Sequence, residues 1–311
     1  MWLLFALLCA LAWGAADLFY KKGADENDRY SHLRTAIWVG IVLGVHGLIT
    51  LISADYRYDF RNLAVYLPVS SMYILSMVIG YFGLRYLELS ISSPVQNTSG
   101  ALVCIMCLVF LKQSIDTLSL FGVVLTCGGV FMLGMIEYRV SSHGISPEES
   151  GYHKGFKAFM FPVIYCVLDA AGTFFDAWYL DDPEFSPLLG VTADNIEDVA
   201  NTGYELTFLI ISVSLMIWLF VIKKQPVFVK GSCAKSRPMA ALLETAGQYA
   251  YVYAMSGSGA LAAPVVAGYC IVALILSRIF LGEKLSRRQY TAIAIAVSGI
   301  ILLGVAEGME L

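Results

Sequence analysis

Charged residues are scarce in this 311-residue sequence, in which Asp, Glu, Lys and Arg together make up 14% of the positions. A soluble protein of this length would form about two domains and carry many more charges, so that class is excluded. The formal net charge of −4 is spread over polar segments and gives no reason to expect a nucleic-acid partner. The sequence is instead 58% hydrophobic, with apolar runs from end to end. Runs of about 20 residues can cross the roughly 30 Å hydrocarbon core of a bilayer, so the composition predicts a membrane protein.

The motifs of several enzyme classes are also missing. No Walker-type GxxxxGK[ST] segment is present, so the sequence does not predict ATP hydrolysis. The four histidines are scattered and none belongs to an HExxH motif, which argues against a membrane-embedded metalloenzyme. Most of the seven cysteines lie in apolar runs, where cysteine behaves as a small hydrophobic residue. Cys104 and Cys107 form a CxxC without a second pair, so we expect no disulfide framework, no metal site and no cofactor.

Two stretches of the sequence are copies of each other. Residues 94–137 align without a gap with residues 264–307, at a shift of 170 positions (264 minus 94). The matching positions include Pro94-Val95 with Pro264-Val265, Phe110-Leu111 with Phe280-Leu281, Gly129 with Gly299, Leu133-Gly134 with Leu303-Gly304, and Glu137 with Glu307. The glycines predict that the last helices of the two copies pack closely. The period is too long for a solenoid repeat and is typical of a transporter built from two halves.

Ten apolar runs are long enough to be spanning helices. They are residues 2–20, Leu33–Ser53, Leu63–Arg85, Ser92–Leu111, Thr117–Ile136, Phe156–Leu180, Tyr204–Ile222, Arg237–Gly257, Ala260–Leu281 and Gln289–Val305. A polar stretch from Glu137 to Lys154 separates the first five from the last five. We therefore predict an all-α membrane protein with ten transmembrane helices: a first repeat over 1–140, a linker over 141–155 and a second repeat over 156–311. Because each half has an odd number of spans, the two five-helix repeats are inverted.

The first run, residues 2–20, could also be a signal peptide because Ala15-Ala16 follows its apolar stretch. It lacks a positively charged start and ends in Lys21-Lys22, so a spanning helix is favoured. Ala15-Ala16 matches Ala170-Ala171 at a shift of 155. The difference from 170 is explained by extra loop in the second half, chiefly Asp181–Gly203.

The distribution of Lys and Arg predicts an orientation in the membrane. Loops on one side carry Lys21, Lys22, Arg29, Arg34, Arg85, Arg139, Lys154, Lys157, Lys223, Lys224, Lys230, Lys235, Arg237, Lys284, Arg287 and Arg288. The opposite side carries only Arg57, Arg61 and Lys112. We therefore expect a multi-pass protein of the cell (inner or plasma) membrane with basic loops in the cytoplasm and both termini outside.

The second copy also carries a family resemblance. The stretch Pro264–Leu303, with the core Phe280-Leu281-Gly282-Glu283-Lys284-Leu285-Ser286, resembles the repeated domain of EamA-type drug/metabolite transporters. Trp13-Gly14 resembles the opening helix of that family. The resemblance covers nearly the whole chain and implies ten helices in two inverted halves, with a substrate cavity between them. It leaves the substrate open, because the family moves amino acids, metabolites, cations and drugs.

Two features depart from the family pattern. Lys112-Gln113-Ser114 in the first half stands where the second half has Gly282-Glu283-Lys284. Family members are commonly described with both termini in the cytoplasm, whereas the charge distribution here predicts the opposite.

Charged side chains at membrane depth cost about 2.5–3.5 kcal/mol each on insertion scales, so each one needs a reason. Tyr165 and Asp169 are four residues apart and share one helix face. Glu244, Gln248 and Tyr251 likewise share one face of a later run. We predict a substrate-binding site made of Trp13, Tyr73, Gln96, Asn97, Tyr165, Asp169, Glu244, Gln248, Tyr249 and Tyr251.

Many polar residues at depth also have structural interpretations. The structural interpretation of Asp17 is a pair with Lys21, and that of Asp176 is a hydrated position near the outer end. Gln96, Asn97 and Thr98 would form interhelical hydrogen bonds. Tyr66 and Tyr251 would be membrane-interface rings, and His46 would be a packed or hydrogen-bonded residue. Asp169 and Glu244 fit such interpretations least, because no Lys or Arg lies at matching depth. Either these two acids are protonated at rest, or they face water and bind a cation.

The sequence therefore favours a secondary transporter that moves a small organic solute by alternating access, with an organic cation or amine as the favoured class. Export or import of amino acids or neutral metabolites, driven by proton exchange, is the alternative. A more distant alternative is a non-transporting membrane receptor, a scaffold or a membrane-embedded enzyme. The expected partners are the small-molecule substrate and the lipid bilayer; the substrate, direction, coupling ion and oligomeric state stay open.

The orientation is testable with an impermeant thiol reagent on intact cells. The 16-to-3 asymmetry of Lys and Arg predicts that the loop Asp181–Gly203 lies outside. A cysteine placed at Asn195 should therefore be labelled without permeabilising the cells. Labelling that requires permeabilisation would reverse the orientation.

Overall fold

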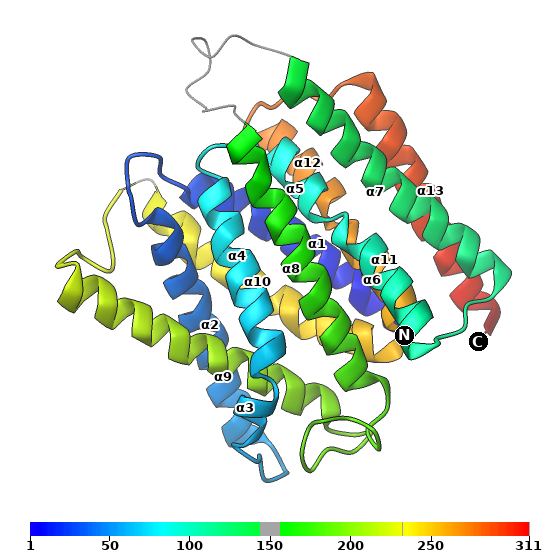
Figure 1. Cartoon of the computed structure of the whole chain (residues 1–311), viewed down its shortest axis with the longest axis horizontal. Helices are drawn as coiled ribbons and strands as arrows, with labels where there is room; N and C mark the ends of the chain where they lie inside the picture. Colours follow the sequence, from blue (N-terminus) through cyan, green and yellow to red (C-terminus); the bar gives the residue numbers. More distant parts are fainter. Residues whose placement is uncertain (144–155, 232, 311) are drawn as a thin grey trace.

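The computed structural model describes residues 1–143, 156–231 and 233–310, and its regular structure there is entirely helical (Figure 1). The α-helices are α1 (Trp2–Gly23), α2 (Ser31–Ser53), α3 (Asn62–Val65), α4 (Leu67–Gly83), α5 (Leu89–Gln96), α6 (Ser99–Met106), α7 (Thr117–His143), α8 (Phe156–Asp181), α9 (Ile196–Ile217), α10 (Cys233–Gly257), α11 (Gly259–Ala267), α12 (Tyr269–Phe280) and α13 (Arg287–Glu310). Two π-helical turns, Cys107–Leu111 and Trp218–Ile222, continue α6 and α9. The predicted all-α class is confirmed.

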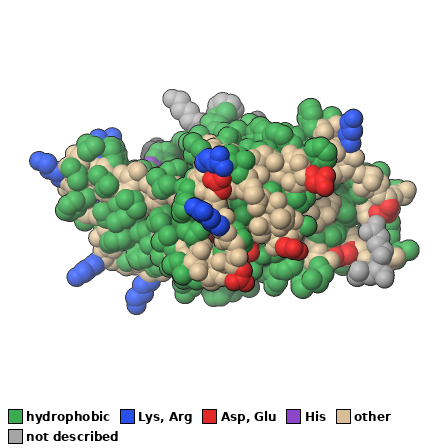
Figure 2. All heavy atoms as spheres, turned by 90° about the horizontal axis from the view of Figure 1, so that it is seen from below, with side chains coloured by type: hydrophobic (Ala, Val, Ile, Leu, Met, Phe, Trp, Pro, Cys, Tyr) green, Lys and Arg blue, Asp and Glu red, His purple; other side chains and the backbone are tan. Residues whose placement is uncertain are grey.

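Eight helical segments in the described residues are long and apolar enough to cross a membrane. Two of the ten expected spans are not among them. The helix α4 is apolar but has only 17 residues. The helix α10 is long enough, but Glu244, Gln248 and three tyrosines lower its hydropathy. Hydrophobic side chains cover much of the face shown in Figure 2, as a lipid environment requires.

The helix bounds differ most from the expected ones at two places. The helix α9 begins at Ile196, so the loop expected over Asp181–Gly203 ends at Asn195. Glu197 and Asp198 lie in its first turn, where acidic side chains stabilise a helix N-terminus. The helix α7 continues to His143, beyond the expected end at Ile136. Most of the expected linker, residues 144–155, lies outside the described residues.

Two of the expected spans are broken helices. The first breaks at Asn97-Thr98, between α5 and α6, and the second at Gly268, between α11 and α12. Thr98 and Gly268 are 170 positions apart (268 minus 98), which is the shift of the duplication. Pro94 and Pro264 lie inside the helices before the two breaks, and proline removes one backbone donor and disturbs the preceding turn. The chain forms the same tight turn at both breaks. The N–H of Thr98 and that of Gly268 each donate to the carbonyl three residues back, at 3.3 Å and 3.0 Å.

The contacts between helices follow the duplication. The first helix of each half packs on the third helix of the other half, as α1 with α10 and α8 with α4. The pairs α2 with α9 and α7 with α13 also join the halves. In Figure 1, α7 and α13 run side by side along one edge of the bundle. The broken helices lie between this pair and the other helices, which places the two breaks in the interior of the molecule.

The pair α7 and α13 begins with equivalent caps. Asp116 Oδ1 accepts hydrogen bonds from the backbone N–H of Leu118 at 2.8 Å and of Ser119 at 3.1 Å. A hydrogen bond with the Ser119 side chain and these backbone bonds lower the pKa of the Asp116 carboxyl. In the second half, Ser286 and Gln289 exchange side-chain and backbone bonds in a capping box. Asp116 and Ser286 are again 170 positions apart.

Glycine permits the close approach of α7 and α13. A Cβ at Gly129 would lie 2.5 Å from the Ala296 nitrogen, and one at Gly299 would lie 2.5 Å from the Gly122 carbonyl oxygen. Such short distances mean that the two backbones are in contact, which only small residues allow. The predicted packing of the last helices of the two repeats is confirmed.

A matched pair of glycines tests this contact. Gly129→Leu should lower the stability of the protein by about 1–3 kcal/mol, because the side chain has no room against α13. Gly128→Leu is the control, since nothing lies within 4 Å of a Cβ at that position. Thermal unfolding of the purified variants in detergent measures both. Equal losses would show that the contact with α13 is not what excludes the larger side chain.

Candidate functional site

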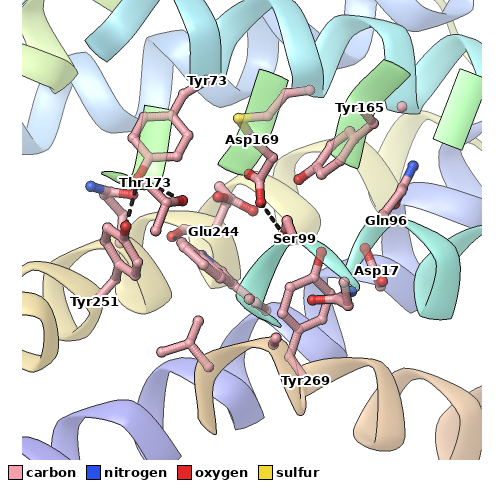
Figure 3. A pocket seen from close by; sticks show the side chains of 18 of the residues that line it. Asp17, Tyr73, Gln96, Ser99, Tyr165, Asp169, Thr173, Glu244, Tyr251 and Tyr269 are labelled. Atoms are coloured by element: carbon pink, nitrogen blue, oxygen red, sulfur yellow. Dashed lines mark hydrogen bonds between the residues drawn. The ribbon is translucent and has the colours of Figure 1, made fainter. Parts of the chain in front are cut away.

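A cavity lies between the two halves, where the broken helices meet α1, α4, α8 and α10 (Figure 3). The space open to the centre of a water-sized sphere is about 70 Å³. A single buried water needs roughly 10–15 Å³ on this measure, so the cavity has room for a few waters or a small solute. The lining side chains are mostly aromatic, amide or acidic, which is unusual for the interior of a helical bundle in lipid.

Nine of the ten predicted site residues line this cavity. They are Trp13, Tyr73, Gln96, Asn97, Tyr165, Asp169, Glu244, Gln248 and Tyr251. Tyr249 does not: it is 42% exposed, and its ring packs against His46 and Tyr253. Successive helix residues are about 100° apart, so the face that carries Gln248 and Tyr251 turns Tyr249 away from the cavity.

Three carboxyl groups from three helices line the cavity, and each accepts a hydrogen bond from a hydroxyl. Asp169 of α8 accepts from Ser99 Oγ at 2.7 Å. Glu244 of α10 accepts from the Tyr20 hydroxyl at 2.9 Å. Asp17 of α1 accepts from Ser93 Oγ at 2.6 Å. No Lys or Arg is among the described residues that line the cavity, so these acids have no cationic partner there.

Asp17 has a different partner from the expected one. The interpretation that it pairs with Lys21 is wrong in this structure, because Ser93 donates to Asp17 and the Lys21 ammonium donates to the carbonyls of Leu84 and Leu87, each at 2.8 Å. Trp13, Asp17 and Tyr20 are spaced four and three apart, which puts them on one face of α1. Because Trp13 is predicted to line the site, this spacing indicates that Asp17 faces the cavity as well.

The break between α5 and α6 organises two of the acids. Ser93 comes before the break and Ser99 after it, and they donate to Asp17 and Asp169 on either side. Asn97, at the break itself, donates to the Ser93 carbonyl at 2.8 Å, and its side chain also hydrogen-bonds with Tyr269 of α12. Figure 3 shows Asp169 and Glu244 in the middle of the cavity, with Asp17 and Gln96 to one side.

Aromatic rings form the rest of the wall. Trp13 stacks on Tyr251 with ring centroids 5.1 Å apart and meets the Tyr269 ring edge-on at 5.9 Å. The indole N–H of Trp13 donates to the Glu244 backbone carbonyl at 3.3 Å. The hydroxyls of Tyr73 and Tyr251 lie 2.6 Å apart. The stacked rings thus line the same cavity as the acids, and Trp13 contacts the backbone of Glu244.

The cavity also contains residues that the sequence analysis did not select. They are Asp17, Tyr20, Met77, Tyr81, Ser99, Thr173, Tyr204 and Tyr269, with several small or aliphatic neighbours. Tyr269 lies two residues after Ala267, which stands 170 positions after the selected Asn97 and also lines the cavity, so the duplication carried a signal for this stretch. The duplication gives no such signal for Tyr204, because it lies between the regions of the second half that align at shifts of 155 and 170 positions.

Asp176 and Tyr66 are both fully buried, which corrects two interpretations. Asp176 is not a hydrated residue near the outer end, because it accepts a hydrogen bond from the Tyr66 hydroxyl inside the bundle. Its second carboxyl oxygen, Oδ2, is buried without a hydrogen-bond partner among the described residues. Tyr66 and Tyr251 are interior residues rather than membrane-interface rings.

His46 is hydrogen-bonded, as expected. Its Nδ1 lies 2.8 Å and 3.0 Å from the two carboxyl oxygens of Glu205 on α9, at a distance from the cavity lining. The sequence does not indicate that Glu205 is buried, because it follows the start of its expected run by only one residue. No group of His, Cys, Asp and Glu able to hold a metal ion occurs among the described residues.

Comparisons with known proteins agree with this architecture. A sequence model of the EamA-like transporter family matches residues 1–135 and 193–305. No curated protein sequence matches the chain significantly. A solved structure titled only "Crystal structure of protein" is similar in fold, with a TM-score of 0.67 over 97% of this chain and 96% of its own, at 13% sequence identity. At that identity, the structural likeness concerns the fold alone.

The hydroxyl of Tyr66 is expected to be a structural requirement. Tyr66→Phe removes the donor to Asp176 and leaves a buried carboxyl group without it, which should cost about 1–3 kcal/mol of stability. Tyr58→Phe is the control, because the Tyr58 hydroxyl is buried without a partner among the described residues and its loss should change little. Thermal unfolding compares the two variants. A larger loss for Tyr58→Phe than for Tyr66→Phe would contradict the assignment.

Proposed function

Because this chain belongs to the EamA-like transporter family, we propose that it carries a small organic cation across the membrane by alternating access. The family belongs to the drug/metabolite transporter superfamily and consists of membrane transporters rather than enzymes. The proposed route is the cavity lined by Asp17, Asp169 and Glu244.

The observation that carries the proposal is the charge of this lining. Three carboxyl groups face one small cavity at membrane depth, and the described part of the chain places no Lys or Arg in its lining. An anionic substrate would need a basic side chain there, because an unpaired anion beside buried carboxylates is repelled by them. A cation instead supplies the partner that the acids lack.

The aromatic wall supports the same class of substrate. Ring faces attract cations, and the gain is about 2 kcal/mol or more when the site is desolvated. The stacked rings of Trp13 and Tyr251 stand beside Glu244, whose backbone carbonyl Trp13 contacts. A choline-like or polyamine-like amine would use these rings and one or more carboxylates at once.

We also propose ten spans in two inverted repeats of five. The helices α4 and α10 carry Tyr73, Tyr81, Glu244 and Gln248 toward the cavity, so polar residues lower their hydropathy without facing lipid. The proposed division stays at 1–140, 141–155 and 156–311, with both termini outside. These assignments rest on the duplication and on the distribution of Lys and Arg.

A second candidate is proton-driven movement of an amino acid or a neutral metabolite. It is favoured by the number of acids, because one monovalent cation does not balance three carboxylates and the others could hold protons. Gln96 and Gln248 in the lining would then contact the neutral solute. Both candidates predict dependence on pH, and they differ in which solutes bind.

Binding of matched solutes to the purified protein separates these candidates. Amines should raise the thermal unfolding temperature, and neutral analogues or carboxylic acids should not. A ligand at 100 times its Kd stabilises a protein by about 2.7 kcal/mol, which a thermal scan resolves. If amine and protons compete for the carboxylates, the amine should bind more tightly at pH 8 than at pH 6. Stabilisation by carboxylic acids but never by amines would end the cation proposal.

Variants connect that result to the cavity. Glu244→Gln should fold but lose most amine stabilisation and most uptake into proteoliposomes. Glu205→Gln is the control, because that acid is equally buried but bonds His46 away from the cavity. Normal uptake by Glu244→Gln would show that this acid has only a structural role.

A further inference from the structure

Each broken helix begins with backbone amides held by a side chain from the other repeat. The Gln113 side-chain oxygen accepts the Ala260 N–H at 3.0 Å, in the first turn of α11. The Glu283 carboxylate accepts the N–H groups of Leu89 at 3.3 Å and Ser90 at 3.1 Å, in the first turn of α5.

These two contacts are related by the duplication. Gln113 and Glu283 are 170 positions apart, and so are Ser90 and Ala260. The sequence departs from the family pattern at Gln113, yet the contact is made at both ends of the molecule. The same cross-repeat contact is thus made by a glutamine in one half and by a glutamate in the other, which points to a shared role for this position.

The first amides of a helix have no partner within the helix and need one from outside. The residues at the helix starts do not supply it, because Glu88 before α5 and Ser258 before α11 make no side-chain capping bond. Gln113 and Glu283 therefore take the place of local caps. Each one also fixes the position of a cavity helix relative to the opposite repeat.

The two contacts lie at opposite ends of the cavity. Glu283 lies at what we call the basic end, where Lys21 donates to the carbonyls of Leu84 and Leu87 and Leu84 lines the cavity. Gln113 lies at the acidic end, where its amide also donates to Asp181 at the end of α8, at 2.6 Å. In Figure 1, α5 and α12 lie together toward one end and α6 and α11 toward the other.

The contacts differ in charge. A carboxylate at a helix N-terminus forms charge-assisted bonds and interacts favourably with the helix dipole. The bond that Gln113 forms with the start of α11 is neutral, and such bonds are roughly half as strong; its charge-assisted bond to Asp181 is solvent-exposed, where water competes for the same groups. The basic end is therefore held more strongly than the acidic end.

We propose that Glu283 and Gln113 are positioning residues that hold the two ends of the cavity closed, and that the acidic end opens more readily because Gln113 is neutral. This rests on the proposed alternating access, since one end must open while the other stays closed. It does not depend on the charge of the substrate.

Thiol alkylation of the purified protein tests both ends at once. Cys107 is fully buried and lies beside Gly259 at the start of α11, so it reports opening of the acidic end. Leu84→Cys introduces a thiol in the cavity lining at the basic end. Mass spectrometry of peptides gives the rate of modification at each position. In the otherwise unchanged chain, we expect Cys107 to react faster than the thiol at position 84.

Charge-removing variants should act at one end only. In the Leu84→Cys background, Glu283→Gln should raise the alkylation rate at position 84 about tenfold, as expected for losing one charge-assisted bond, and leave Cys107 unchanged. Glu88→Gln is the control, because it removes a carboxylate beside the same helix start that makes no capping bond. An unchanged rate at position 84, or an equal rise at both positions, would overturn the proposal.

A strengthening variant keeps the test decisive if Glu283→Gln does not fold. Gln113→Glu combined with Asp181→Asn places a carboxylate at the start of α11 without a facing acid, and should slow alkylation of Cys107. A rate at Cys107 that does not fall would contradict the role of Gln113. Alkylation requires no substrate, and amine stabilisation is measured separately, so failure here is distinguishable from failure of the cation proposal.

Discussion

A helix that breaks inside a bilayer exposes peptide groups that lipid cannot satisfy, and much of this structure follows from two such breaks. At the two breaks, the N–H groups of Thr98 and Gly268 donate to the carbonyls three residues back, which replaces part of the lost helical hydrogen bonding. The starts of the same helices are satisfied by Gln113 and Glu283 from the opposite repeat. Each half thus completes the hydrogen bonding at a helix start of the other, and the breaks themselves lie inside the bundle and not at its lipid-facing surface.

The same break determines the chemistry of the cavity. Ser93 and Ser99 can donate to acids on two different helices because the chain changes direction between them. A continuous helix would fix residues six apart at about 120° from each other around one cylinder, so the break gives the two serines directions that a continuous helix does not. Hydroxyl donors stabilise a carboxyl group at lower cost than a buried cation would, and they leave the charge available to a ligand. The proposed cation would replace one of these hydroxyl bonds with an ionic one.

The sequence predicted the duplication, the helical class and most of the cavity, because these depend on periodicity. Pairs such as Glu244 with Gln248 share a face whatever the neighbours are, so their placement could be foreseen. The prediction of Tyr249 is wrong because its angle on α10 turns the ring away from the cavity, although an aromatic residue suits the site. Asp17 was assigned to Lys21 because local spacing suggests a pair, whereas Ser93, 76 residues away, became its partner only through packing. The cross-repeat contacts of Gln113 and Glu283 could not be predicted, since nothing in either loop indicates which helix start it meets.

The three cavity acids belong to α1, α8 and α10, which come from both repeats. In a chain that carries cations, loss of the ligand would leave three carboxyl groups facing one another across the junction between the halves, and those that stay ionised would repel one another. Their repulsion acts to separate the walls, and it grows as water leaves the cavity, because a lower dielectric strengthens it. A bound cation reverses the sign of that force and pulls the same three helices together. The empty cavity then favours an open arrangement of the three helices, and the cavity with a bound cation favours a closed one.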